Sequence, residues 1–170
     1  MDFEDKELYT SYLLNLLCND EKALGIVCDI ISDDYKKKRI NIDNTFYDVI
    51  LRKLKSEMKD SHDLETIWLV YLLRQTEYKM TYSVLKEILN SNNELAIIVA
   101  IEEWKELISK EDFEKCWEKA KSWILLYQIA LNDEDKRDLF IEKLGISHNR
   151  DFYQKLFQNG FSFYKRCDGF

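Results

Sequence analysis

Residues suited to metal binding or nucleophilic catalysis are few and widely separated in this chain of 170 residues. Zinc sites combine cysteine and histidine ligands at short, regular spacings. Here the cysteines form no C-x-x-C pair and lie far in sequence from both histidines. These residues are Cys18, Cys28, Cys116, Cys167, His62 and His148. We therefore predict no zinc site, and we expect the cysteines to be reduced and mostly buried or inert, as in a cytoplasmic protein.

Two pairs of residues that include an aspartate or glutamate are spaced as metal ligands could be. His62 and Glu65 are three residues apart, but no second His-acid pair shares that spacing, so a capping histidine and a surface glutamate are the better interpretation. Asp33 and Asp34 match in composition the aspartate pair that holds magnesium in polymerases. That pair follows an aromatic residue and one further residue on a hairpin, whereas Ile31-Ser32 precedes this one at a predicted helix end. A solvated helix terminus is favoured.

Other catalytic motifs are absent from the sequence. No arginine is followed after four residues by histidine, the spacing of a common helical ribonuclease class, and there is no Gly-rich phosphate loop. We therefore predict no catalytic residue, no metal, no cofactor and no small-molecule substrate.

A basic segment stands out against a net charge of −7. Residues 1–34 hold nine acids and two lysines, whereas residues 35–60 hold eight bases and four acids. Clustered cations bind a nucleic-acid backbone by releasing counterions. The candidate contacts to RNA or DNA are Lys36, Lys37, Lys38, Arg39, Arg52, Lys55 and Lys59, with Lys53 beside them. The alternative is that these bases pair with the acidic first helices or favour the C-terminus of the second helix.

Helical periodicity accounts for most of the chain. There is no proline, there are only four glycines, and Leu, Ile, Glu and Lys are abundant. A first helix is predicted from about Asp5 to Cys18, with a stripe of Leu8, Tyr12, Leu16, Leu13 and Leu17. A second, from Glu21 to about Tyr35, buries Leu24, Val27, Cys28 and Ile31.

Short polar residues mark where later helices begin. Capping positions are predicted at Asp43-Asn44-Thr45, Ser61–Asp63, Thr81 and Ser109, the last with Asp112 at the position of a capping box. The helix after Asp63 carries Leu64, Ile67, Trp68, Tyr71 and Leu72 at helical spacing. Further helices are predicted over Leu95 to Ile108, over Asp133 to Leu144 with Gly145 as C-cap, and within Phe152 to Tyr164.

The segment Lys115 to Leu131 is predicted to be the central helix. Its second half, from Trp123 to Leu131, is apolar except for Gln128, so neighbouring helices should cover most sides of it. It is too short to span a bilayer. The large aromatic residues are interpreted as packing residues rather than as a base-stacking surface. They are Trp68, Trp104, Trp117, Trp123 and Tyr127.

The fold class predicted from these elements is all-α. About eight or nine helices with short links indicate an irregular helical array or HEAT-like stacked helical hairpins. Residues 1–170 are expected to form a single helical domain, with charged N-terminal helices over 1–60. The acidic N-terminus and the lack of a long apolar run predict a cytoplasmic protein that does not contact a membrane.

Three pieces in order resemble one protein family. Glu65 to Leu73 resembles an E-x-x-W-x-x-Y/W-L helix, Trp123 to Gln128 resembles a W-L-L-L-Y-E segment, and Phe152 to Tyr164 resembles a closing F-F-x-x-L-x-x-x-G-I-S-F-Y segment. The three segments that these pieces resemble are found in the C-terminal helical region of prokaryotic reverse transcriptases of antiphage-defence and abortive-infection type. The order and approximate spacing agree across about residues 60 to 165.

The resemblance implies a function without catalysis. The polymerase domain of that family is missing from this chain, and Gln128 replaces the usual acid. What remains would be a helical module that packs on a polymerase domain or subunit and positions nucleic acid or a partner; no tyrosine is assigned as a priming residue. The alternative from another class is a stand-alone helical-repeat protein whose acidic N-terminal helices dock another protein.

Overall fold

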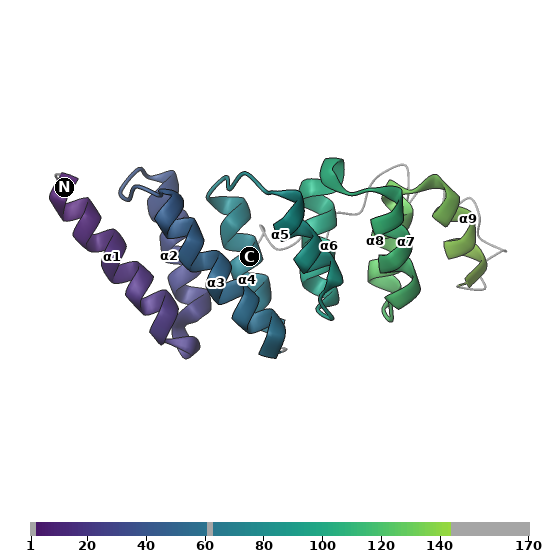
Figure 1. Cartoon of the computed structure of the whole chain (residues 1–170), viewed down its shortest axis with the longest axis horizontal. Helices are drawn as coiled ribbons and strands as arrows, with labels where there is room; N and C mark the ends of the chain where they lie inside the picture. The colour runs from purple at the N-terminus through teal and green to yellow at the C-terminus, as the bar shows by residue number, and fades with distance from the viewer. Residues whose placement is uncertain (1–2, 61–62, 144–170) are drawn as a thin grey trace. The chain divides into compact units, whose positions relative to one another are not determined.

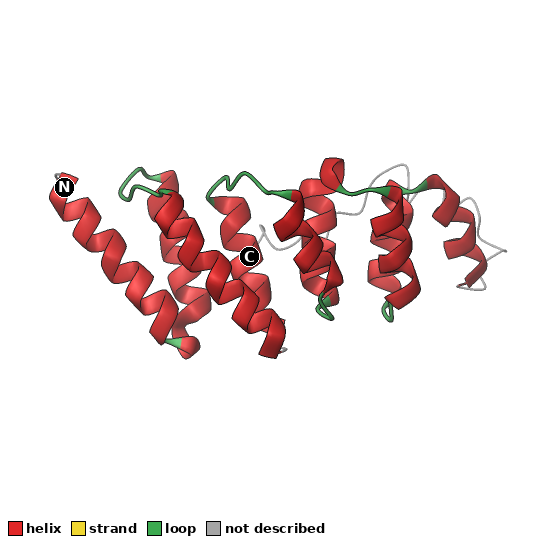
Figure 2. Cartoon of the chain, in the orientation of Figure 1, coloured by secondary structure: helices red, strands yellow, loops and turns green. Residues whose placement is uncertain are grey.

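The computed structural model describes residues 3–60 and 63–143, and this part of the chain is all helical, with no strand. The α-helices are α1 (Phe3–Asn19), α2 (Leu24–Lys36), α3 (Asn44–Asp60), α4 (Asp63–Gln75), α5 (Tyr82–Asn90), α6 (Glu94–Trp104), α7 (Lys110–Lys119), α8 (Trp123–Asn132) and α9 (Glu134–Lys143). Two 3₁₀ turns, Glu21–Ala23 and Lys105–Leu107, precede α2 and follow α6. The all-α prediction with about eight or nine helices is confirmed (Figure 2).

The chain divides into two compact units, Met1–Ala100 and Ile101–Phe170, here called the N-terminal and C-terminal units. In the N-terminal unit two helical hairpins, α1/α2 and α3/α4, stack so that α1 packs against α3 and α2 packs against α4 (Figure 1). In the C-terminal unit α8 packs against both α7 and α9. Stacked hairpins leave one side of each helix exposed, which makes such arrays suitable as binding scaffolds.

The core of the N-terminal unit confirms part of the predicted stripes. Leu24, Val27, Cys28 and Ile31 of α2 are all buried, as expected. In α1 Leu13 and Leu17 are buried, whereas Leu8 and Tyr12 are exposed. In α4 the buried apolar residues are Leu69, Val70, Leu72 and Leu73, whereas Leu64 and Trp68 are exposed. The wide apolar stripes of α1 and α4 are therefore only partly covered by the neighbouring helices.

Local capping signals are confirmed where the structure describes them. Asp43 accepts a hydrogen bond from the backbone N–H of Phe46 (2.9 Å), and the side chain of Thr81 caps α5. Ser109 and Asp112 form the predicted capping box at the start of α7. Each cap satisfies backbone N–H groups that have no partner within the helix.

The predicted central helix over Lys115 to Leu131 is wrong, because two helices occupy this segment. α7 ends at Lys119, Ala120 has an extended backbone (ψ 126°), and Ser122 begins α8 by accepting a hydrogen bond from the N–H of Leu125 (3.2 Å). The apolar second half is buried over Leu125 to Ala130, as expected, but Trp123 is 56% exposed.

A small core holds the C-terminal unit together. Tyr127 of α8 and Phe140 of α9 are buried with Leu126 and Ala130, and their ring centroids are 5.7 Å apart. Partly buried Trp117, Ala120 and Leu131 pack around this cluster. Tyr127 is thus a packing residue, as predicted.

Some predictions lie outside the described residues: Gly145 as a C-cap, the helix within Phe152 to Tyr164, and the capping role of His62. Within the described ranges, none of the helices combines the length and apolar character needed to cross a membrane.

Candidate interaction surfaces

The first group of predicted basic residues lies at the C-terminal end of α2. Lys38 has a left-handed backbone (φ 57°), so that the N–H of Arg39 donates to the carbonyl of Asp34 and the N–H of Lys38 donates to that of Tyr35. These two bonds form a Schellman motif, a helix end that usually contains glycine at the left-handed position. Basic side chains at this end interact favourably with the helix dipole. Part of their role is therefore to end α2.

Carboxylates of the same helix pair with two of these four bases. Lys37 lies 2.7 Å from Asp33, and Arg39 lies 3.2 Å from Asp34. Lys37 lowers the pKa of the Asp33 carboxyl, chiefly through their hydrogen bond. The prediction of a solvated helix terminus for this pair is confirmed for exposed Asp33 but is wrong for Asp34, which is buried and also accepts a hydrogen bond from Tyr9.

The second group lies on one exposed side of α3. Arg52, Lys55 and Lys59 are separated by three and four residues, so they follow one another on successive turns. Arg52 and Lys55 line a hollow of about 400 Å³ together with Asp48, Leu51 and Val84 of α5. Lys55 also pairs with Glu87 of α5 at 3.0 Å.

Lys53 differs from Arg52 and Lys55 because it is half-buried and not exposed. Its side chain is only 13% exposed and pairs at 2.8 Å with buried Glu57, four residues on. It therefore contributes to the interior of the N-terminal unit and not to a basic patch.

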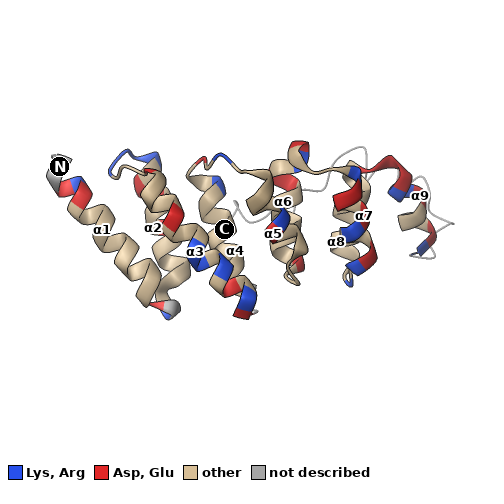
Figure 3. Cartoon of the chain, viewed as in Figure 1, with Lys and Arg blue, Asp and Glu red and all other residues tan. Residues whose placement is uncertain are grey.

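The structure does not bring the two basic groups together. Asn44, the first residue of α3, follows the α2 end closely, and Lys59 lies 15 residues further along that helix, which at 1.5 Å per residue is about 22 Å. Figure 3 shows the blue segments separated accordingly, at the loop after α2 and in the second half of α3. Their contact with nucleic acid stays a prediction.

A surface that the sequence did not single out lies on α2 and α4. Ile26 and Ile30 are 66% and 39% exposed, and Leu64 and Trp68 are 67% and 37% exposed. Each pair is four residues apart, so its members are neighbours on one side of their helix. We call these four residues the α2/α4 face. The feature of the sequence that marks this face is a second pair of apolar residues four apart in α2, Ile26 and Ile30, on the side opposite the buried residues.

Gly25 lets the two helices of this face meet closely. A Cβ atom placed on Gly25 would lie 3.0 Å from both Nε1 and Cε2 of Trp68, so a larger residue would displace the indole ring. The absence of a side chain allows the ring to lie against the backbone of α2 at Gly25. Trp68 was expected to be a packing residue, and it packs on one side while 37% of it remains exposed.

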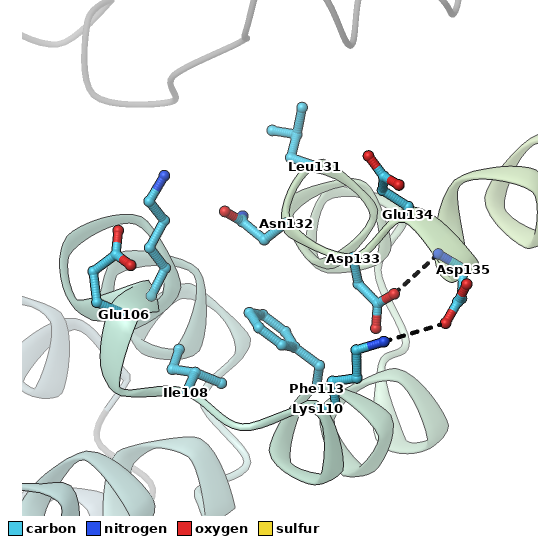
Figure 4. Close-up of a pocket in the computed structure, with 10 residues that line it drawn as sticks. Glu106, Ile108, Lys110, Phe113, Leu131, Asn132, Asp133, Glu134 and Asp135 are labelled. Atoms are coloured by element: carbon cyan, nitrogen blue, oxygen red, sulfur yellow. Dashed lines mark hydrogen bonds and ion pairs between the residues drawn. The ribbon is translucent and has the colours of Figure 1, made fainter.

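The C-terminal unit contains a hollow of about 630 Å³ between the turn after α6 and the junction of α8 with α9. Figure 4 shows Phe113 and Asn132 pointing into it, whereas Leu131 and Glu134 point away. Three of the four carboxylates that line it, those of Asp133, Glu134 and Asp135, have local partners. Asp133 accepts from the N–H of Asp135 (3.0 Å), the Asp135 carboxylate lies 3.6 Å from Lys110, and that of Glu134 lies 3.6 Å from Arg137. These contacts order the start of α9.

The titratable groups favour structure over reactivity. Hydrogen bonding to Asp34 and then burial raise the pKa of Tyr9, and burial raises that of Tyr35 and Tyr47. Burial also raises the pKa of Cys28 to about 12 and that of Cys116 above its usual value. A nucleophilic hydroxyl or thiol requires the opposite shift. Across the described residues, no cluster of three or more His, Cys, Asp or Glu side chains could hold a metal ion.

Comparison with known proteins gives no relative: neither a family model, nor a curated protein, nor a solved structure matches this chain significantly. The surfaces themselves therefore carry the functional argument.

Proposed function

We propose that the chain is a non-catalytic helical scaffold that binds another protein through the α2/α4 face. The observation that carries this proposal is the exposure of Ile26, Ile30, Leu64 and Trp68 on two helices that pack together. Single exposed apolar residues are common, but a contiguous group of them marks an interaction site. Trp68 of α4 lies against Gly25 of α2, which joins the α4 pair to the helix that carries Ile26 and Ile30.

The expected partner follows from the family resemblance. A helical module of a defence-type reverse transcriptase would hold a polymerase domain or subunit, and the α2/α4 face provides an apolar surface for that purpose. The absence of catalysis and a cytoplasmic location are parts of the same proposal, the latter expected from the scattered cysteines.

The test uses the chain and the product of the neighbouring reading frame, purified separately and mixed. Sedimentation velocity should show a stable complex, and Ile26→Ser combined with Ile30→Ser should weaken it at least about tenfold, which corresponds to 1.4 kcal/mol. Leu139→Ser is the matched control, because Leu139 is similarly exposed (43%) but lies on α9. A complex that tolerates the double substitution as well as it tolerates the control would contradict the α2/α4 face as the docking site.

A second candidate function, positioning of nucleic acid, is favoured by one observation. Arg52 and Lys55 line the hollow between α3 and α5, with Lys59 on the next turn. A gel shift with single-stranded RNA and DNA should then show binding that weakens steeply with salt. It should weaken further when Arg52, Lys55 and Lys59 are changed to Glu, and separately when Lys36 to Arg39 are changed to Glu. The absence of any shift at low salt would end this candidate.

A further inference from the structure

Isoleucine and aspartate alternate along the exposed side of α2. Ile26, Asp29, Ile30 and Asp33 follow one another at steps of three, one and three residues, and all four are exposed. This spacing places them on one side of the helix within two turns. The helical repeat of α2 places the row of Asp29 and Asp33 between the row of Ile26 and Ile30 and the side of Gly25, where Trp68 packs.

The carboxylates of Asp29 and Asp33 differ in whether another residue pairs with them. Among the described residues, Asp29 has no cation within ion-pair distance and no hydrogen-bond partner. Asp33 pairs with Lys37, but both side chains are about half exposed, at 53% and 52%. Exposed pairs of this kind contribute little free energy, so the Asp33 carboxylate can exchange one cation for another.

Trp68 supplies a fixed aromatic wall beside this row. Its indole lies against Gly25, which is one residue before Ile26 and one turn before Asp29. Partly exposed tryptophans that are held in place by the fold often contribute most of the energy of an interface.

We propose that the α2/α4 face receives an amphipathic helix of the partner protein, one that carries lysine or arginine beside its apolar side. This inference deepens the proposed function and rests on it. The apolar side chains of that helix lie on Ile26, Ile30 and Trp68, and its cations lie opposite Asp29 and Asp33. A helix fits because Ile26 and Ile30, like Asp29 and Asp33, repeat every four residues, the spacing at which a partner helix presents its own side chains.

The same charges disfavour other occupants. A second copy of the chain would bring the same two carboxylates, Asp29 and Asp33, to a self-complementary interface, where they would repel their equivalents. A nucleic acid would bring phosphates to these two carboxylates. Lysine or arginine on the partner instead gains from both carboxylates.

The test uses three fluorescently labelled helical peptides of about 18 residues, or five turns. They share one apolar side and carry Lys, Gln or Glu along both borders of it. Anisotropy at low salt should show that the Lys peptide binds the full chain at least about tenfold more tightly than the Glu peptide. Asp29→Asn with Asp33→Asn should remove most of that preference, and Ile26→Ser should weaken the Lys and Gln peptides to the same extent.

Glu118→Gln with Glu142→Gln is the matched control, because it neutralises two exposed carboxylates in the C-terminal unit and should preserve the preference. Equal binding of all three peptides, or no binding of any, overturns the inference. In either case the proposed function is decided by a separate measurement, the sedimentation of the chain and its Ile26→Ser/Ile30→Ser variant with the product of the neighbouring reading frame. A dimer of the chain alone that is lost in Ile26→Ser would show that a second copy occupies the face, and would also overturn the inference.

Discussion

The hydroxyl of Tyr9 in α1 donates a 2.7 Å hydrogen bond to the carboxylate of Asp34 in α2. Asp34 is buried and its other oxygen accepts a hydrogen bond from Arg39, so one carboxylate connects the first helix to the end of the second. Lys6 of α1 also donates to the carbonyl of Lys38 at 3.0 Å. The end of α2 that carries the basic segment is therefore held by α1.

Tyr9→Phe tests this connection. Because it removes one of the two side-chain partners of a buried carboxylate, it should lower the free energy of unfolding by about 1 to 2 kcal/mol. Urea denaturation measures the change. Tyr12→Phe is the control, because Tyr12 is 59% exposed on the same helix and should be neutral. Equal stability of the two variants would mean that the hydrogen bond adds nothing.

Glycine should stabilise the protein at the two positions after α2 and α4 where the backbone is left-handed. Lys38 and Glu77 both have a φ of 57°, which costs a residue with a Cβ atom about 1 kcal/mol or more. Lys38→Gly and Glu77→Gly should therefore each raise the free energy of unfolding by roughly 0.5 to 1 kcal/mol, as measured by urea denaturation.

Lys38→Ala and Glu77→Ala separate backbone strain from the loss of charge, because alanine keeps the strained φ. They should show no gain in stability. A gain with alanine equal to that with glycine would show that the side chains, and not the backbone, are unfavourable at these positions.

The buried thiol of Cys28 should make stability depend on alkaline pH. Burial, with a smaller contribution from Asp29, raises its pKa to about 12 in the folded chain, against about 9 when unfolded. Because the pKa of Cys28 is higher in the folded chain, its contribution to folding stability is fully present below the unfolded-state pKa. That contribution is lost as the pH rises from the unfolded-state pKa towards the folded-state pKa. In that window this thiol should lower the free energy of unfolding by up to about 1.4 kcal/mol per pH unit.

Cys28→Ala isolates this contribution. It should lower stability at neutral pH by leaving a small cavity, but its decline between about pH 9 and 10.5 should be shallower than that of the parent chain. Denaturant midpoints across the pH series measure both slopes. Parallel profiles would show that the thiol does not titrate differently on folding.

Glu114→Gln should destabilise the C-terminal unit. Lys136 is only 7% exposed, pairs with Glu114, and lies 5.5 Å from the ring centroid of Trp117. Removing the carboxylate leaves a nearly buried cation with the aromatic ring alone, at a cost of about 1 to 2 kcal/mol. Thermal or urea unfolding measures it.

Asp135→Asn is the matched carboxyl-to-amide control. Its pair with Lys110 is 3.6 Å long and more than four-fifths exposed on both sides, so its loss should change stability by no more than about 0.5 kcal/mol. A similar cost for both substitutions would contradict the importance of burial for the Lys136 pair.

The sequence predicted those features of the fold that depend on nearby residues. Caps such as Asp43, Thr81 and Ser109 act within three residues of themselves, so their chemistry is visible in the sequence. The break at Ser122 was missed because no glycine or proline marks it, although Lys119 and Lys121 precede it and the apolar run begins only at Trp123. A serine directly before an apolar run, in the position of an N-cap, was the local signal.

Which residues of a helix lie on the surface depends on contacts between helices, and the order of the sequence does not reveal these contacts. Helical spacing showed that Leu8, Tyr12 and Trp68 belong to apolar stripes, but the packing of α1 and α4 decides which part of each stripe is covered. Likewise Lys55 pairs with Glu87, which is 32 residues away and on another helix. The burial of Lys53 with Glu57 was accessible in principle, because four residues separate them.

The most direct test of the scaffold account is a map of backbone and side-chain NMR shifts on adding the Lys-bearing probe peptide to the full chain. The account predicts that the largest changes lie in α2 and α4, at Ile26, Asp29, Ile30 and the indole N–H of Trp68, while the indole signals of Trp104, Trp117 and Trp123 stay in place. Changes centred on Arg52, Lys55 and Lys59 of α3, or changes confined to the C-terminal unit, would contradict it.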